Sequence, residues 1–416
     1  MLFFYRIAIN LIVLFSPLII FFRLLIKKED PIRFKEKFCF FSKKKVKKKL
    51  IWFHGASVGE ILSILPLVEK LEKNKNINQI LITSNTLSSS KILSNLKLKK
   101  TIHQFFPIDT NYLTKKFLDY WDPSLAIFID SEIWPNMLIA IKKKSVPLML
   151  LNARITKKTF KKWNLFNASA KNLFEKFDIC LTSNLKSKKY LKILGAKKIK
   201  FIGNLKFSQT ERNEDYLDHN LKKFFLTKKI WCASSTHNTE EKICGLAHKK
   251  LKRKYKNLLT IIIPRHIERT KYIVDEMKKL NLKVHTDSSK NKVNKDTDIY
   301  LVNSYGRTKS FFRICKTVFL GGSMISHGGQ NPLEATRYGC KILHGPNIWN
   351  FDEIYGLLNK HNVSKQINNF NQMTYNIDKI FRYKNNSKNI KSIIKNLGNK
   401  ILSSTIKEVN FFINKK

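Results

Sequence analysis

The chain has 416 residues, 43% of them apolar, which is more than one hydrophobic core of ordinary size holds, so its length predicts two domains. Its formal net charge of +49, from 79 Lys and Arg against 30 Asp and Glu, favours an anionic partner. The six cysteines lie without CxxC or Cys/His ligand spacing, so the sequence argues against both a zinc site and a disulfide framework.

The first 28 residues are predicted to anchor the chain at a membrane. Residues 7–26 are almost wholly apolar, and Lys27 and Lys28 follow them directly. No small-residue cleavage site follows this run, which argues against a secretory signal peptide. The run has about the length that spans a bilayer, although Pro17 and Arg23 shorten it, so a spanning helix and an interfacial helix are both open.

A basic stretch, KKKVKKK at residues 43–49, lies close behind the apolar run. Each cation near an anionic leaflet adds roughly 1 kcal/mol to membrane binding, although a solvated loop explains this stretch equally well. Because positively charged flanks stay on the cytoplasmic side, we expect the body of the protein in the cytoplasm.

From residue 50 onwards, short apolar runs alternate with amphipathic helical stretches, which is typical of βαβ units and a parallel sheet. Strands are predicted within residues 50–53, 79–83, 125–130, 146–152, 177–183, 198–204, 230–235, 258–264, 298–304 and 317–323. The stretch 206–227 is rich in acidic residues and shows no strand pattern, so we interpret it as a linker. The pattern predicts an anchor (1–28), a first Rossmann-like domain (29–205), this linker, and a second Rossmann-like domain (228–416). Two doubly wound α/β domains facing each other across a cleft form the architecture called GT-B among glycosyltransferases.

Ser57, Gly59 and Glu60 follow the first predicted strand, where a helix is expected to begin. Small residues there let a ligand approach the backbone. Ser57 and Glu60 have the spacing of a capping box, in which each side chain binds the other's backbone N–H. Glu60 is therefore either a helix cap or a general base that takes a proton from an acceptor hydroxyl.

Two further candidate groups follow strands of the first domain. Asp130 and Glu132 come directly after the strand at 125–130, and strand ends of this kind form ligand sites. Helix capping explains Asp130 almost as well. Lys206 stands at the expected domain junction, a position suited to meeting a phosphate.

The second half carries small and polar residues at three strand ends. Ser235, Thr236 and His237 precede a helix whose free amides suit a phosphate. Arg265 follows the strand at 258–264 and suits a bidentate phosphate contact. Gly322 and Ser323 lie near an amide and carboxylate segment, GGQNPLE at residues 328–334, where a carboxylate can accept hydrogen bonds from ribose hydroxyls.

Taken together, these segments resemble the 3-deoxy-D-manno-octulosonic acid (Kdo) transferases of lipopolysaccharide assembly, glycosyltransferase family 30. The resemblance runs in order along the chain. It rests on SVGE at 57–60, SEIWPN at 131–136, NAR at 152–154, GNLKF at 203–207, STHNTEE at 235–241, PRHIER at 264–269, GGS at 321–323, GGQNPLE at 328–334 and GPNIWNF at 345–351.

The resemblance implies an inverting GT-B transferase that moves Kdo from CMP-Kdo to the lipid A precursor lipid IVA, at the cytoplasmic face of a bacterial inner membrane. It implies no metal and no other cofactor. Glu60 would be the base, and Asp130 and Lys206 would stabilise the transition state. The CMP contacts would fall on Pro264, Arg265, Tyr305, Gly306, Arg307, Asn331, Pro332, Leu333 and Glu334.

Three positions depart from the family pattern. Asp130 stands where Glu is usual, Gln330 replaces a histidine, and Arg307 replaces a common acidic residue. The number of Kdo residues transferred and the oligomeric state stay open.

Two other functions compete with Kdo transfer. One is a GT-B enzyme with a UDP-sugar donor. The other is a membrane-tethered nucleic-acid-binding protein, but the basic residues are spread along the whole chain, whereas such proteins more often concentrate charge in one patch. We therefore expect no specific nucleic-acid partner, and an anionic membrane surface instead.

Overall fold

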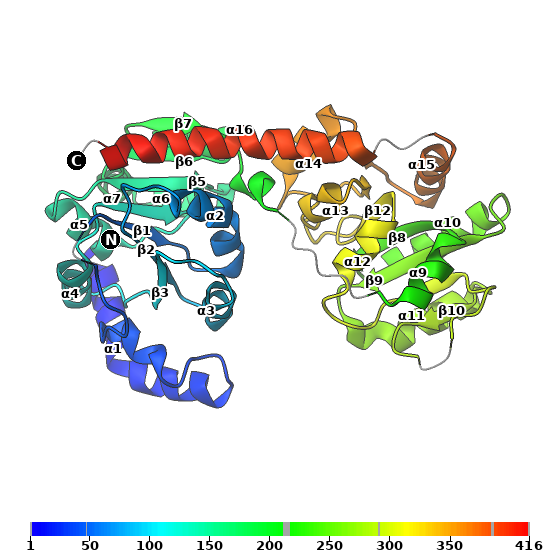
Figure 1. Ribbon diagram of the computed structural model, residues 1–416, viewed down its shortest axis with the longest axis horizontal. Helices are drawn as coiled ribbons and strands as arrows, with labels where there is room; N and C mark the ends of the chain where they lie inside the picture. The colour runs from blue at the N-terminus through cyan, green and yellow to red at the C-terminus, as the bar shows by residue number, and fades with distance from the viewer. Residues whose placement is uncertain (1, 47, 211–216, 290–291, 384–386, 415–416) are drawn as a thin grey trace. The chain divides into compact units, whose positions relative to one another are not determined.

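The computed structural model describes residues 2–46, 48–210, 217–289, 292–383 and 387–414 (Figure 1). The chain divides into two compact units, residues 1–209 with 397–416, and residues 210–396. Lys47 of the basic stretch and residues 211–216 of the expected linker lie outside the described residues.

The first unit is built on a seven-stranded sheet in the order β3-β2-β1-β4-β5-β6-β7, with every neighbouring pair parallel. Helices flank the sheet (Figure 1). The strands are β1 (Leu50–His54), β2 (Gln79–Ser84), β3 (Thr101–Phe105), β4 (Leu125–Ile129), β5 (Leu148–Ala153), β6 (Ile179–Thr182) and β7 (Ile199–Phe201). The helices are α1 (Leu2–Leu25), η1 (Arg33–Phe38), α2 (Val58–Leu71), α3 (Leu87–Ser94), α4 (Asn111–Trp121), α5 (Pro135–Lys143), α6 (Lys157–Asn164), α7 (Asn167–Phe174), α8 (Leu185–Ile193) and η2 (Leu205–Ser208).

The second unit contains another seven-stranded parallel sheet, in the order β10-β11-β9-β8-β12-β13-β14. Its strands are β8 (Lys229–Thr236), β9 (Leu258–Pro264), β10 (Val284–Thr286), β11 (Ile299–Leu301), β12 (Thr317–Leu320), β13 (Lys341–His344) and β14 (Ser364–Gln366). Its helices are α9 (His219–Leu226), α10 (Glu240–Lys252), η3 (Ile267–Arg269), α11 (Thr270–Lys279), α12 (Thr308–Ile314), α13 (Leu333–Arg337), α14 (Asp352–Lys360) and α15 (Phe370–Arg382). A last helix, α16 (Ser387–Asn414), begins in this unit, and its residues from 397 onwards belong to the first.

Alternate residues of the central strands fill two separate cores in the second unit. Cys232 and Ile261 belong to one buried cluster, whereas Trp231 and Ile262 belong to another. Because successive side chains of a strand point to opposite faces, the sheet is covered on both sides. This explains why the sequence reads as continuous apolar runs, and it confirms the prediction of parallel α/β domains.

Two boundaries differ from those expected. The stretch 206–227 contains α9, whose Phe225 is buried in the core of the second unit. Residues 397–416, expected in the second domain, group with the first unit because α16 buries an apolar stripe there. Its buried side chains include Ile401, Leu402, Val409 and Ile413, and Lys49 donates to the carbonyl of Ile413 at 2.6 Å.

Helix α1 is long and apolar enough to cross a membrane, judged by length and composition alone. Tyr5 donates from its hydroxyl to Asp109 at 2.7 Å, and Arg6 donates to Asn136 at 3.0 Å. Most of its large apolar side chains are exposed, among them Phe3, Phe4, Leu14, Phe15, Leu18, Phe21 and Phe22. The helix is thus attached to the first unit while it presents an apolar face to its surroundings.

Candidate active site

Glu60 lies in the first turn of α2, directly beyond the carboxyl end of β1. The capping box forms: the Glu60 amide donates to the Ser57 hydroxyl at 3.4 Å, and the Ser57 amide donates to Glu60 Oε2 at 3.2 Å. Gly59 is exposed, and a Cβ there would meet only Ser57 Oγ, at 4.0 Å. The backbone beside Glu60 is therefore open to a ligand, and capping engages Oε2 of its carboxylate.

Burial raises the pKa of Glu60 to about 7, and repulsion from the carboxylates of Glu132 and Asp130 adds to the effect. A carboxyl group of this pKa exchanges its proton near neutral pH, which is the property required of a general base. The capping bonds from Ser57 act in the opposite direction but do not outweigh burial. The cap is thus confirmed, and the raised pKa is compatible with the role of a base, which stays a prediction.

Glu132 holds a negative charge close to Glu60. Burial opposes that charge, but the electrostatic contact with His54 and the hydrogen bond from Trp134 outweigh burial and lower the pKa of Glu132. Trp134 donates from its ring nitrogen to Glu132 Oε2 at 2.8 Å, and His54 Nε2 lies 3.3 Å from the same oxygen. Near neutral pH Glu132 is therefore charged, whereas Glu60 is close to its own pKa and only partly protonated.

His54 supports this arrangement from within the sheet. Its ring is fully buried, which lowers its pKa and keeps it neutral. Nδ1 lies 3.0 Å from the hydroxyl of Thr83 on the neighbouring strand β2. Nε2 faces Glu132 Oε2 at 3.3 Å without forming a hydrogen bond among the described residues, so the contact between His54 and Glu132 is electrostatic.

Asp130 directly follows the last residue of β4, and its backbone adopts the left-handed conformation. Its φ is 55°, and Asn152 at the end of β5 has φ 54°. Non-glycine residues in this left-handed region cluster at functional sites. The Asn152 side-chain amide donates to Asp130 Oδ1, and its carbonyl oxygen accepts from the Leu205 amide at 2.9 Å.

Lys206 comes close to Asp130 through this bridge. Burial raises the pKa of Asp130, and the positive charges of Lys206 and Arg154 act in the opposite direction. The Lys206 amide donates to Asn204 at 2.9 Å, which fixes the start of η2. The structure thus brings Glu60, Asp130, Glu132 and Lys206 into one constellation at the carboxyl ends of β1, β4 and β5.

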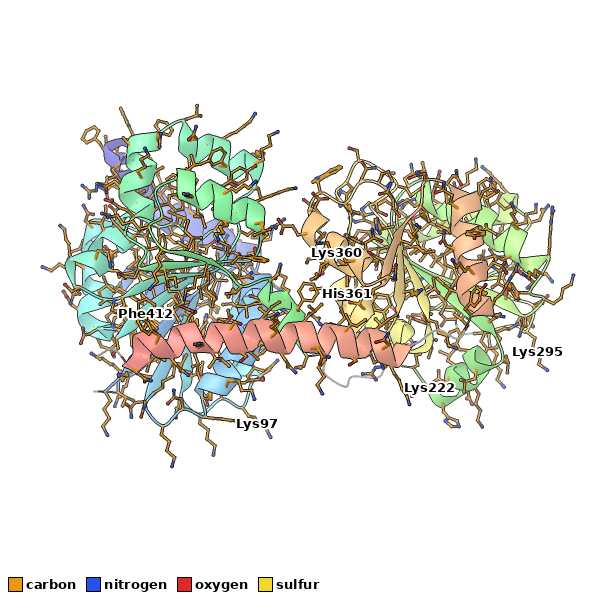
Figure 2. The ribbon with its side chains drawn as sticks, turned by 90° about the horizontal axis from the view of Figure 1, so that it is seen from above. Lys97, Lys222, Lys295, Lys360, His361 and Phe412 are labelled. Carbon is orange, nitrogen blue, oxygen red and sulfur yellow. The ribbon has the colours of Figure 1, made fainter. Side chains whose placement is uncertain are left out.

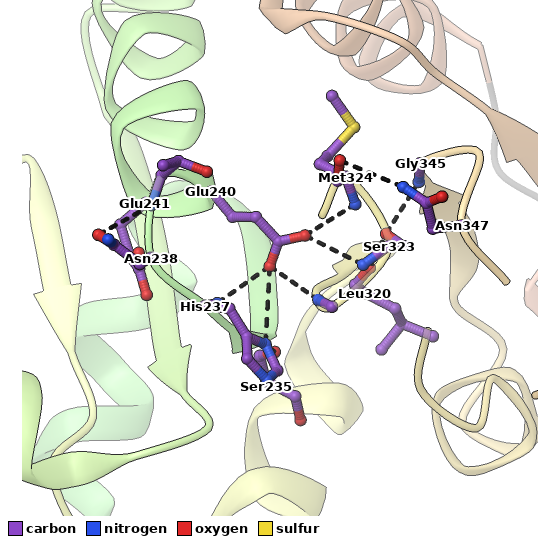
Figure 3. Close-up of polar contacts among 12 residues, drawn as sticks. Ser235, His237, Asn238, Glu240, Glu241, Leu320, Ser323, Met324, Gly345 and Asn347 are labelled. Atoms are coloured by element: carbon purple, nitrogen blue, oxygen red, sulfur yellow. Dashed lines mark hydrogen bonds and ion pairs between the residues drawn. The ribbon is translucent and has the colours of Figure 1, made fainter. Parts of the chain in front are cut away.

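In the second unit, Glu240 ties together the loops that follow β8 and β12 (Figure 3). Its buried carboxylate accepts four backbone N–H bonds, from His237, Gly322, Ser323 and Met324, at 2.7 to 3.1 Å. Ser323 is fully buried as well, and its hydroxyl donates to the Leu320 carbonyl and accepts from the Gly345 amide. Ser323 is therefore a structural residue of the loop, although the sequence pattern made it a candidate for ligand contact.

The loop after β8 carries Ser235, Thr236 and His237. Ser235 has φ 55°, and Thr239 at the start of α10 has φ 75°, which is rare for a β-branched residue. Thr236 is buried, and its carbonyl accepts from the Arg265 amide at 3.0 Å. Pro264 is buried at the end of β9, whereas the Arg265 side chain is exposed.

The remaining predicted nucleotide contacts occupy two other loops. Tyr305 is 70% exposed, with its hydroxyl 3.3 Å from Glu268, and a Cβ at Gly306 would meet nothing within 4 Å. Arg307 forms an ion pair with Asp287, which also accepts from the Tyr300 hydroxyl. The buried carboxylate of Asp287 thus balances the positive charge of Arg307, which stands where an acidic residue was expected from the resemblance.

Asn331 to Glu334 open helix α13. The side chain of Asn331 accepts from the Leu333 amide at 3.2 Å, and Pro332 and Leu333 are buried. Glu334 is half-exposed and lies 4.0 Å from Lys309. Of these residues, Asn331 and Glu334 present polar groups at the surface of the second unit.

Sequence reasoning passed over three histidines. His54 stands inside an apolar run, and its partner Thr83 lies 29 residues away, so only strand pairing reveals the contact. His266 and His327 lie beside His237, with ring centroids 6.0 and 4.5 Å from its ring. Among the residues that the structure describes, no set of three His, Cys, Asp or Glu side chains is placed to hold a metal ion.

Comparison with known proteins places these residues in a family. A family model described as 3-deoxy-D-manno-octulosonic-acid transferase (kdotransferase) matches residues 32–209. The 3-deoxy-D-manno-octulosonic acid transferase of Rickettsia bellii is 35% identical over 332 residues, which cover 79% of each chain. The enzyme of the same description from Haemophilus influenzae is 29% identical and covers 74% of this chain and 73% of its own.

Among solved structures, a putative UDP-N-acetylglucosamine 2-epimerase from Listeria monocytogenes matches with a TM-score of 0.58 and 14% identity, covering 87% of this chain and 97% of its own. That likeness shows the fold alone and confirms the GT-B class. The identity to the Rickettsia enzyme goes further. It confirms the resemblance seen in the sequence: the chain belongs to the 3-deoxy-D-manno-octulosonic acid transferase family of glycosyltransferases.

Proposed function

We propose that this glycosyltransferase moves Kdo from CMP-Kdo to lipid IVA with inversion at the anomeric carbon, releasing CMP, at the cytoplasmic face of a bacterial inner membrane. The observation that carries the proposal is Glu60, whose pKa is raised to about 7 beside the charged Glu132 at the end of β1. A base of this kind suits the deprotonation of a sugar hydroxyl near neutral pH.

In the proposed step, Glu60 accepts the proton of an acceptor hydroxyl as the oxygen attacks the anomeric carbon of Kdo. The new C–O bond forms as the bond from that carbon to the phosphate oxygen of CMP breaks, and the electron pair leaves with CMP. Lys206 and Asp130 are assigned to stabilising the charge that develops. Preorganised charges supply a large share of such stabilisation when water is excluded.

The second unit is proposed to hold the nucleotide. Arg265 is exposed at the end of β9 and is suited to a phosphate, and Glu334 is suited to ribose hydroxyls. Pro264, Tyr305, Gly306, Arg307, Asn331, Pro332 and Leu333 complete the proposed contacts. The bisphosphorylated acceptor and the donor are both anionic, in keeping with the net charge of +49.

The test is transfer of radiolabelled Kdo, with CMP-Kdo generated in the assay, to tetraacylated lipid A precursor. Native protein is compared with Glu60→Gln. Glutamine preserves the capping box, because its amide oxygen still accepts from the Ser57 amide, but it cannot take a proton. We expect Glu60→Gln to lose about 10²- to 10⁴-fold in rate with little change in stability.

Thr86→Ala is the matched control for helix capping, because Thr86 caps α3 in the same unit. It should lose about 1 kcal/mol of stability and keep its transfer rate. If Glu60→Gln transfers Kdo as fast as native protein, Glu60 is a cap alone. If native protein uses a UDP-sugar and not CMP-Kdo, the donor assignment fails.

A further inference from the structure

Three imidazole rings gather at the carboxyl ends of the three central strands of the second unit. His237 follows β8, His266 follows β9 and His327 lies in the loop after β12, and these strands are neighbours in the order β9-β8-β12. The ring of His237 lies between the other two, 4.5 Å from His327 and 6.0 Å from His266 between centroids. In a doubly wound sheet, this central strand edge is where ligands bind.

His237 presents one ring nitrogen without a partner. Its Nδ1 lies 3.1 Å from the Ser235 carbonyl, so Nδ1 carries a proton and donates it there. Its Nε2 is buried and has no hydrogen-bond partner among the described residues. A neutral His237 thus offers a lone pair at Nε2, and a protonated one offers an N–H donor with a positive charge.

The titratable groups around His237 are mostly basic side chains. Burial lowers its pKa, and His327, His266 and Arg265 lower it further by repulsion, although the bond to Ser235 raises it. Among the described residues, Glu240 is the one acid paired with His237, with its Oε2 3.8 Å from Nδ1. Its carboxylate lies on the Nδ1 side of the ring and is already bonded by four backbone N–H groups.

The backbone is shaped to hold these rings together. Gly322 has φ 64°, and a Cβ there would lie 2.9 Å from the His327 ring and 3.2 Å from the His237 ring. Ser235 and Thr239 adopt left-handed conformations on either side of His237. Figure 3 shows how Glu240 fixes the main chain of this loop to that of the loop after β12. Strain of this kind persists only where the surrounding contacts enforce it.

We infer that His237, His266 and His327 form a binding site for an anionic group of the donor, and that His237 takes up a proton from solvent when this group binds. The inference rests on the proposed function and extends it. CMP-Kdo carries two anionic groups of suitable chemistry, the phosphate and the sugar carboxylate. An anion against Nε2 accepts a hydrogen bond from the protonated ring and offsets the repulsion that lowers the pKa of His237.

Three ligands distinguish whether the site binds the phosphate or the sugar carboxylate. Cytidine carries neither group, CMP carries the phosphate, and CMP-Kdo carries both. Calorimetry measures the binding of cytidine and CMP, repeated in buffers of different ionisation enthalpy to count protons. The transfer assay gives KM for CMP-Kdo. The variant is His237→Asn, and the matched control is His361→Asn, an exposed histidine of the same unit labelled in Figure 2.

We expect His237→Asn to weaken binding of the relevant ligand by about tenfold or more, as for loss of one charge-assisted hydrogen bond. Weaker CMP binding, with proton uptake in native protein that the variant lacks, identifies the phosphate. Unchanged CMP binding identifies the carboxylate if the KM of His237→Asn for CMP-Kdo is raised over that of native protein, and if this excess shrinks from about pH 6 to about pH 8 as native His237 loses its proton. Cytidine binding and His361→Asn should stay at native values.

The inference is overturned if His237→Asn binds CMP and uses CMP-Kdo within twofold of native protein, or if it loses cytidine affinity equally. Should His237→Asn not fold, His327→Asn tests the same site from an exposed position and should show the same ligand selectivity with a smaller loss. If native protein transfers Kdo and the histidine variants bind CMP and use CMP-Kdo as native protein does, this inference alone is wrong. If native protein neither binds CMP nor transfers Kdo, both the proposed function and this inference are wrong.

Discussion

The pKa of Glu60 depends on the neighbouring carboxylate of Glu132, which takes no direct part in the proposed reaction. Glu132 keeps its charge because Trp134 donates to it and His54 lies in electrostatic contact with it, and that charge disfavours a second one on Glu60. Since a base must be ionised to act, the rate should rise with pH through about 7 as Glu60 loses its proton. The contacts of Glu132 thus bear on the working pH of the proposed base.

Glu132→Gln should therefore move the rising limb of the pH–rate profile to lower pH. The amide removes the repulsive charge but not the burial of Glu60, so the limb should not reach the pKa of an exposed carboxyl group. The profile of kcat/KM between about pH 5 and about pH 9 measures the shift. A limb that stays at the native pH in Glu132→Gln would show that burial alone sets the proton affinity of Glu60.

Glu240 stabilises the structure by accepting backbone hydrogen bonds from two loops of the second unit. Glu240→Ala would leave four backbone N–H groups near His237 and Gly322 without their acceptor. Because unsatisfied buried donors cost about 1–3 kcal/mol each before water enters, we expect a loss of about 3 kcal/mol or more. Urea denaturation measures it, with the exposed Glu353→Ala as a control that should change stability by less than about 0.5 kcal/mol. Equal midpoints for the two variants would contradict this role.

Much of the candidate site was predictable from one rule, that carboxyl ends of parallel strands meet at one edge. That rule places Glu60, Asp130 and Glu132 together without any knowledge of side-chain geometry. It does not reveal which carboxylate is charged, because that depends on His54 and Trp134. It also does not separate Ser323, whose hydroxyl is used within its loop, from His237, whose Nε2 has no partner among the described residues.

At the scale of elements, every apolar run assigned to a strand contains one in the structure. Four further strands escaped prediction: β3, β10, β13 and β14. Three of them lie at sheet edges. Edge strands are covered less completely, so they do not need the continuous apolar run that marks a strand buried on both faces; β14, for example, reads Ser-Lys-Gln.

Helix α1 carries a prediction of its own. The exposed side chains of Phe21 and Phe22 stand on its apolar face. Replacing both with serine should weaken binding to vesicles containing anionic lipid by about tenfold or more, because two aromatic side chains lose their burial in lipid. Flotation assays measure the bound fraction. Tyr375→Ser, an exposed aromatic position on α15, should bind as native protein does. If the double variant floats equally well, the attachment lies elsewhere, for instance in residues 43–49.

At the scale of the whole molecule, positive charge is spread over both units. Lys97 of the first unit and Lys295 and Lys360 of the second, which Figure 2 labels, are all exposed. A charge spread in this way attracts polyanions without reading their sequence. It is compatible with a membrane surface and with anionic substrates alike.

Duplex DNA should accordingly bind weakly and without sequence preference. Because such binding depends on displaced counterions, the affinity should fall steeply between about 50 mM and about 200 mM salt. Fluorescence anisotropy with two unrelated duplexes measures both properties. Tight binding to one duplex that survives the higher salt would revive the interpretation as a nucleic-acid-binding protein.

Helix α16 has a consequence for the order in which the molecule is made. Residues 397–414 complete the core of the first unit, yet the ribosome synthesises them after the whole of the second unit. The first unit therefore stays incomplete while residues 210–396 are synthesised. During that time the surface that Val409 and Ile413 later cover is exposed to water. Domains usually fold in the order of their synthesis. Here the unit that starts first is finished last, and a nascent chain stalled before residue 397 would expose an apolar strip to the chaperones of the cell.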